Sequence, residues 1–164
     1  MDSSTQPVSH LNLPLQFNVR VYGILIDSTN RILISDEYIR GNYFTKFPGG
    51  GLEFGEGTRN CLVREFKEET NLNIIVGKHI YTTDIFQLSA FNSRHQIISI
   101  YYYVHTNEPI NLSTKSTKFD FAPHQIADPK GQAEVHRWIA LADITEDDID
   151  LPLDKIVVGI LKEV

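Results

Sequence analysis

The stretch GGGLEFGEGTRNCLVREFKEETNL, residues 49–72, decides the fold and the chemistry of this chain. It holds five of the chain's ten glycines and five glutamates. Glycines followed by an amphipathic charged run predict a loop leading into a helix over about 58–70, with Asn71 in the left-handed position after its end. The stretch is either a solvated acidic helix behind a flexible loop or a built metal site.

The predicted helix gathers its acidic side chains on one face. At 100° per residue, Glu65, Glu68 and Glu69 fall within an arc of about 100°. Close like charges on a helix cost a few tenths of a kcal/mol per pair, and Arg64 can offset only one carboxylate at the edge. A divalent cation would balance the remaining two. The adjoining apolar arc, which would pack on a sheet, contains Leu62, Val63 and Phe66.

Carboxylates at this spacing suit Mg²⁺ or Mn²⁺, which prefer hard oxygen ligands and keep waters for substrate phosphates. The glycine loop lets the backbone pass close to the same point, where a carbonyl can add a ligand. The loop lacks GK[ST] and is therefore not a phosphate-binding P-loop. Taken alone, each fragment is more often a solvated helix face or a flexible turn, so the metal interpretation depends on the combination.

The whole chain has the composition of one globular domain. It has 164 residues, 41% hydrophobic and 22% charged, and a net charge of −6. The acidic balance argues against binding to duplex nucleic acid, and no apolar run approaches the ~20 residues that span a membrane. The single cysteine, Cys61, allows no intramolecular disulfide and suits a cytoplasmic protein. We interpret it as a packed thiol rather than a nucleophile.

The order of predicted elements favours an α/β (α+β) fold, a mixed β-sheet sandwiched between α-helices. Residues 1–14 are expected to form a flexible polar tail, and residues 15–164 the domain. A hairpin is predicted over 17–35, strand-forming segments over 73–91 and 96–106, an irregular segment over 107–131, a last strand over 133–141, and a C-terminal amphipathic helix containing Ile156, Ile160 and Leu161.

Read from Gly50, the spacing of the stretch resembles the Nudix box, G-x5-E-x7-R-E-U-x-E-E-x-G-U, where U is apolar. The match continues through Glu56, Arg64 and the three clustered glutamates to Leu72. A chance match of this quality is on the order of one in 100,000. The final glycine is replaced by Asn71, the next most tolerant residue in a left-handed conformation, and we expect no functional consequence.

The resemblance implies the Nudix fold and a set of site residues. Glu65, Glu68 and Glu69 would bind Mg²⁺ or Mn²⁺, with the Gly49 carbonyl as a further ligand. Arg64 would hold the glutamates by charge-assisted hydrogen bonds, while Gly50 and Glu56 would support the loop and the helix start. Family members often add a later acidic residue as ligand or general base. Here Glu134 is the first candidate and Asp128 the second.

The implied reaction is hydrolysis of a diphosphate linked to another moiety, with Glu65 or Glu134 as general base. The expected substrate is a nucleotide sugar or a related nucleoside diphosphate, contacted by Arg94, His95 and Phe86. The alternative is a catalytically weak domain that senses or binds nucleotides. A Nudix-fold isoprenoid isomerase is a third reading, but Cys61 lies inside the predicted metal helix. Family members are often dimers, which leaves a homodimer open.

Overall fold

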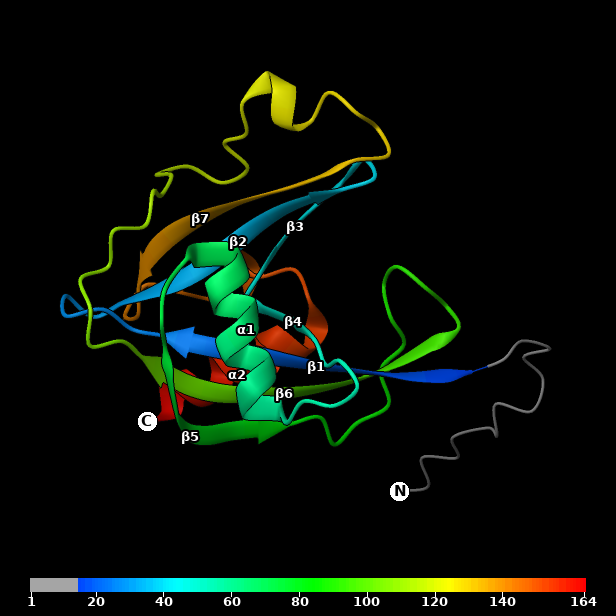
Figure 1. The fold of residues 1–164 in the computed structure, drawn as a ribbon, viewed down its shortest axis with the longest axis horizontal. Helices are drawn as coiled ribbons and strands as arrows, with labels where there is room; N and C mark the ends of the chain where they lie inside the picture. The colour runs from blue at the N-terminus through cyan, green and yellow to red at the C-terminus, as the bar shows by residue number, and fades with distance from the viewer. Residues whose placement is uncertain (1–14) are drawn as a thin grey trace.

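The computed structural model describes residues 15–164, whose strands form two sheets with helices packed against them (Figure 1). The tail expected over 1–14 lies outside the described residues. The elements are β1 (Gln16–Leu25), β2 (Arg31–Ile39), β3 (Asn42–Lys46), β4 (Gly49–Gly51), α1 (Thr58–Thr70), β5 (Ile75–Thr82), β6 (His95–His105), η2 (Pro123–Gln125), β7 (Gln132–Ala140), η3 (Glu146–Asp148) and α2 (Pro152–Glu163).

The larger sheet is mixed and lies between the two helices. Its order is β4-β1-β6-β5, with β1 parallel to β6 and antiparallel to β4. The smaller sheet, β3-β2-β7, is antiparallel. Figure 1 shows α1 in front of the larger sheet and α2 behind it. The predicted mixed sheet sandwiched between helices is therefore confirmed.

Residues 21–25 of strand β1 are buried on both faces of the sheet because their side chains alternate between two cores. Val21 and Leu25 pack with α1, whereas Tyr22 and Ile24 pack in the core that includes α2. A Cβ built on Gly23 would lie 2.6 Å from the Phe66 ring, so the missing side chain lets α1 approach the sheet closely. This packing fixes the face of α1 that carries the glutamates.

The helix prediction over 58–70 is confirmed, but the hairpin predicted over 17–35 is wrong. Strands β1 and β2 belong to different sheets, and only an isolated bridge between Ile26 and Ile32 joins them. Strand β2 is instead flanked by β3 and β7, so both of its edges are already paired. The β2–β3 hairpin turns through Arg40 and Gly41, which both have positive φ.

Two other predictions from the strand pattern need correction. The segment 73–91 does not continue as strand, because β5 ends at Thr82 and only an isolated bridge between Leu88 and Gln96 follows before β6. Within β5 the register with β6 shifts after Val76 and again after His79, as at a bulge. The triple glycine, expected to be a loop, forms β4 and pairs with β1.

The segment over 107–131 is irregular, as predicted, apart from the short turn η2. It is tied to the smaller sheet by the Lys115 amide, which donates to the His136 carbonyl at 2.8 Å, and by the Phe119 amide, which donates to Asp36 at 3.1 Å. The last strand and the C-terminal helix are also confirmed. In α2 the most deeply buried hydrophobic residues are Leu153, Val157, Val158 and Leu161, with Ile156 partly buried beside them.

Candidate functional site

Arg64 lies at the centre of a hydrogen-bond network between α1 and the preceding loop. Its Nε and Nη2 donate to the two oxygens of Glu56 at 3.0 and 2.7 Å, and Nη2 also donates to the Gly51 carbonyl at 3.1 Å. Its Nη1 donates to Glu65 at 3.0 Å and to Glu68 at 3.3 Å. The guanidinium thus contacts two of the three clustered glutamates, one more than the sequence suggested, and leaves Glu69 outside its network.

Glu56 completes the connection to the loop. Its Oε1 accepts a hydrogen bond from the Glu53 amide at 2.9 Å, and the hydrogen bonds from Arg64 lower its pKa to about 2. A carboxylate that accepts from both partners orders the loop against the second turn of the helix. This is the contact expected from a residue that supports the loop and helix start.

Gly49 and Gly50 are required by close packing at the same place. Gly49 has φ of 144°, and a Cβ there would lie 2.1 Å from the Val21 carbonyl oxygen. A Cβ on Gly50 would lie 2.4 Å from the Glu65 carboxylate. The carbonyl of Gly49 accepts a hydrogen bond from Lys46 Nζ at 3.3 Å. The glycines therefore let the backbone of β4 pass directly beside the first clustered glutamate.

Strands β2 and β7 bring further ionisable groups to the site. Their antiparallel register sets Glu37 opposite Glu134, and Ser35 opposite His136. Glu134 and His136 are two apart on one strand and share a face. Ser35 Oγ donates to Glu134 Oε1 at 2.8 Å. Glu134, predicted as a late acidic residue of the site, thus lies with a neighbouring histidine that the sequence analysis did not select.

Lys46 supplies the buried positive charge of the site. Its Nζ lies 2.9 Å from Glu37 Oε1, and the residue is 3% exposed. Burial alone would lower its pKa, but the carboxylates of Glu37, Glu69 and Glu134 outweigh it and raise that pKa. Two acidic side chains facing each other across β2 and β7 would repel, and this ammonium offsets the repulsion.

The pKa values of the remaining two buried carboxylates shift in opposite directions, although burial raises both. Desolvation, reinforced by Glu134 and Glu65, raises the pKa of Glu69 to about 9 despite Lys46. For Glu134, desolvation is outweighed by the contact with His136 and by Lys46, and the pKa falls to about 2. In the protein without a bound cation, Glu69 therefore holds its proton at neutral pH while Glu134 is ionised.

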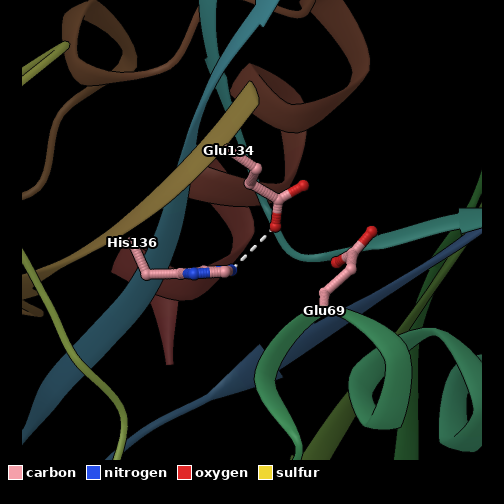
Figure 2. Close-up of side chains that lie close together, drawn as sticks. All are labelled: Glu69, Glu134 and His136. Carbon is pink, nitrogen blue, oxygen red and sulfur yellow. Dashed lines mark ion pairs between the residues drawn. The ribbon is translucent and has the colours of Figure 1, made fainter. Parts of the chain in front are cut away.

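Glu69, Glu134 and His136 converge on one point, Glu69 from the end of α1 and the other two from β7 (Figure 2). His136 Nε2 lies 2.8 Å from Glu134 Oε1, but the contact lacks the alignment of a hydrogen bond. Among residues 15–164, His136 Nε2 and Glu69 Oε2 are the buried side-chain polar atoms without a hydrogen-bond partner. These are atoms that a cation could use.

Two hollows adjoin this cluster. The helix-side hollow, about 480 Å³, is lined by Glu69, Glu134 and His136 together with Lys115 and His124 of the irregular segment. The intersheet hollow, about 390 Å³, lies between the two sheets. Its lining includes Arg20, Glu37, Phe44, Lys46, Phe91 and His95. Glu134 thus lines the helix-side hollow, and Glu37, its partner across β2 and β7, lines the intersheet hollow.

The residues predicted to contact substrate are divided by the structure. His95 lines the intersheet hollow, whereas Arg94 and Phe86 are exposed and lie outside its lining. Asp128, the second acidic candidate, is not part of the converging cluster; its carboxylate accepts from the Lys130 amide at 2.9 Å. His136 could have been found from the sequence, because it lies two residues after Glu134 on a predicted strand and therefore on the same face.

Cys61 is buried, and its Sγ lies 3.5 Å from the Gly51 carbonyl. Burial, together with Glu56, raises the pKa of this thiol to about 12. A thiol that stays protonated is a poor nucleophile or acid catalyst at neutral pH. The packed-thiol interpretation therefore agrees with the structure. A buried, protonated Cys61 argues against the isomerase, which needs a cysteine facing the substrate.

Comparison with known proteins gives a family match and several structural relatives. The family model described as NUDIX domain matches residues 16–157. The fold is similar to a MutT protein from Methanosarcina mazei Go1, at 14% identity and TM-score 0.63, covering 92% of this chain and 96% of that one. It is also similar to an ADP-ribose pyrophosphatase from Streptococcus suis 89-1591, at 15% identity and TM-score 0.54, covering 92% and 91%.

A UDP-X diphosphatase is a third structural relative, at 17% identity and TM-score 0.55, covering 96% of this chain and 66% of that one. No curated protein matches the chain in sequence. Within residues 15–164, no helix combines the length and apolar character needed to cross a membrane.

Proposed function

The chain belongs to the NUDIX family, and from that premise we propose that it is a divalent-metal-dependent hydrolase that cleaves the diphosphate linkage of a nucleoside diphosphate joined to another moiety. The observation that carries the proposal is the Glu69–Glu134–His136 convergence beside a helix-side hollow that also presents Lys115 and His124. A lysine ammonium and an imidazole facing a carboxylate cluster suit a phosphate chain held against a bound cation.

The side chains present fit the cation that the family implies. Glu65, Glu68 and Glu69 would hold it, with the Gly49 carbonyl as a further oxygen ligand. Glu69 Oε2 is buried and lacks a hydrogen-bond partner in the protein, so a bound cation would satisfy it. When bound, Mg²⁺ or Mn²⁺ neutralises charge on the phosphates and lowers the pKa of a water.

The protein's own groups carry the rest of the mechanism. Glu65 or Glu134 accepts the proton of the attacking water. Arg64 acts as a positioning residue: it holds Glu65 and Glu68 while Glu56 holds it in turn. Lys46 keeps the facing carboxylates of Glu37 and Glu134 together in the buried wall of the site.

The intersheet hollow is the proposed place for the nucleoside. Phe44 and Phe91 form a ring pair there with centroids 4.9 Å apart, and His95 lines the same space. Aromatic faces can stack on a base. Two structural relatives named as acting on ADP-ribose and on UDP-X are consistent with a substrate of this class. Arg94 and Phe86 would meet substrate only at the outer edge of this hollow.

We also place the protein in the cytoplasm, since its single cysteine is free and buried. The net charge of −6 opposes binding to duplex nucleic acid, whereas bound divalent cations can bring the phosphates of a small diphosphate to an acidic site.

The test is phosphate release, coupled to a phosphatase, with Mg²⁺ and with Mn²⁺ over nucleotide sugars, dinucleotides and nucleoside triphosphates. Glu65→Gln and Glu69→Gln should each lower turnover by at least about 100-fold. Glu53→Gln is the matched control, because Glu53 belongs to the same stretch but its side chain is 69% exposed. Glu53→Gln should retain wild-type turnover.

The same panel separates the hydrolase from the nucleotide-sensing alternative. A hydrolase turns over at least one member of the panel in a metal-dependent way. Tight binding of a nucleotide by calorimetry, with no phosphate released from any member, would instead favour the sensor. Wild-type rates in both glutamine variants would contradict the assignment of the site.

A further inference from the structure

We propose that Glu69, Glu134 and His136 form a mixed nitrogen and oxygen site for a divalent transition-metal cation of the Mn²⁺ and Zn²⁺ class. This inference deepens the proposed function and rests on it for the shared residue Glu69. It adds a ligand, His136, that comes from β7 and that the spacing of residues 49–72 does not supply. The site lies in the helix-side hollow.

The three side chains already have nearly the spacing of a chelating set. One potential ligand atom from each lies within 4.8 Å of the others. Two ligands at about 2.1 Å from a tetrahedral zinc ion lie about 3.4 Å apart. The most distant pair would have to approach by up to about 1.4 Å, which rotation of the glutamate side chains can supply.

Two buried polar atoms of the cluster lack a hydrogen-bond partner. The His136 side chain is 6% exposed, and its Nε2 has no hydrogen-bond partner. Glu69 Oε2 is also buried without a hydrogen-bond partner. Leaving a buried polar atom unpaired costs about 1–3 kcal/mol. His136 Nε2 lies 2.8 Å from Glu134 Oε1, which is an ion pair only when the imidazole is protonated, and that pair leaves Glu69 Oε2 unsatisfied. A cation shared by the three side chains would satisfy both buried atoms.

The nitrogen donor selects the class of cation. Mg²⁺ strongly prefers oxygen ligands and retains its waters. Imidazole suits borderline transition metals, and mixed carboxylate and imidazole sets are common for them. Ser35 donates to Glu134 at 2.8 Å, an outer contact that holds a ligand in orientation. The site should therefore prefer Mn²⁺ or Zn²⁺ to Mg²⁺.

Pulsed electron paramagnetic resonance of the metal-free full-length chain loaded with Mn²⁺ tests this directly. Nitrogen coupled to the bound Mn²⁺ is expected in the wild type, with the coupling changing when histidine is labelled with ¹⁵N. In His136→Gln the coupling should disappear and Mn²⁺ affinity should fall at least about tenfold. Affinity for Mg²⁺ should change less than about threefold, since its ligands are oxygens.

His124→Gln is the matched control, because His124 lines the same hollow but is exposed. It should keep both the nitrogen coupling and the Mn²⁺ affinity. Bound Mn²⁺ without nitrogen coupling in the wild type would overturn the site, and this measurement needs no variant to fold. Equal Mn²⁺ affinity in wild type and His136→Gln would overturn it too.

The two proposals fail in different ways. Nitrogen coupling that depends on His136, in a protein that hydrolyses none of the panel, would support this site and overturn the hydrolase. Metal-dependent hydrolysis with no nitrogen coupling would support the hydrolase and overturn this site.

Discussion

Arg64 on the second turn of α1 reaches back to Glu56 in the loop before the helix and binds it through two parallel hydrogen bonds, of 3.0 and 2.7 Å. The same guanidinium holds Glu65 and Glu68. One planar group with donors in a fixed fork thereby sets the loop and two carboxylates relative to each other. Charge and geometry are both needed here.

Arg64→Lys should therefore be damaging although it keeps the charge. An ammonium cannot make the paired contacts to Glu56 and also reach two other carboxylates. Turnover should fall at least about tenfold, and the free energy of unfolding by about 1–3 kcal/mol. Phosphate release and urea unfolding measure the two effects. Arg59→Lys, on the same helix but stacked on Tyr102, is the control; equal effects in both variants would refute the special role of Arg64.

Gly50→Ala should reduce activity while the fold stays intact. The new Cβ would lie 2.4 Å from the Glu65 carboxylate, which can rotate away because it is the end of a flexible side chain. Displacing a catalytic group by about 1 Å can cost about 100-fold in rate. Gly51→Ala is the control, since the nearest neighbour of its Cβ would be Arg20 Nη1, 3.8 Å away. Steady-state kinetics should separate the two variants, while their thermal midpoints stay similar.

Asn71 ends α1 with φ of 58°, so the stability of variants at this position should depend on how readily the new residue adopts the left-handed conformation. Asn71→Ala should lower the free energy of unfolding by about 1 kcal/mol, because a Cβ without a compensating polar group disfavours this conformation. Asn71→Gly should equal or exceed the wild type. Both should keep wild-type turnover. Urea unfolding gives the comparison, and an equal loss in both variants would show that the Asn side chain acts in another way.

Asp154 should make stability depend on pH. It is fully buried, and desolvation raises its pKa from 3.8 to about 6 although Tyr101, Phe47, Lys46 and Arg20 favour the ionised form. Between these values the folded state binds more protons than the unfolded state, so this group's contribution to stability falls as pH rises. A shift of about two pKa units corresponds to about 3 kcal/mol.

The measurement is the free energy of unfolding of wild type minus that of Asp154→Asn at pH 4, 5, 6 and 7. The difference should move against the wild type by about 2–3 kcal/mol from pH 4 to 6 and then level off. Using the difference cancels the other titrating groups that the two proteins share. Parallel profiles across this range would show that Asp154 keeps its ordinary pKa in the fold.

Local sequence was enough for the helix and its acidic face. The boundaries of α1, the left-handed Asn71 and the gathering of Glu65, Glu68 and Glu69 all follow from helical period and end signals within 24 residues. The mixed sheet between helices also followed from element order. Strand partners did not, because the pattern of a strand says which face is buried and not which neighbour it pairs with. The predicted β1–β2 hairpin was wrong for that reason.

By itself, the sequence determined the family and the helix that carries the Nudix box, and it predicted metal-dependent chemistry, since all three follow from one continuous stretch. Only the tertiary structure decided that Glu134 and His136 of β7 meet Glu69 of α1, with Glu37 and Lys46 behind them. Those residues are far apart along the chain, and their protonation and ligand strength depend on shared burial. Burial and register are set by how the two sheets pack, which no local pattern encodes.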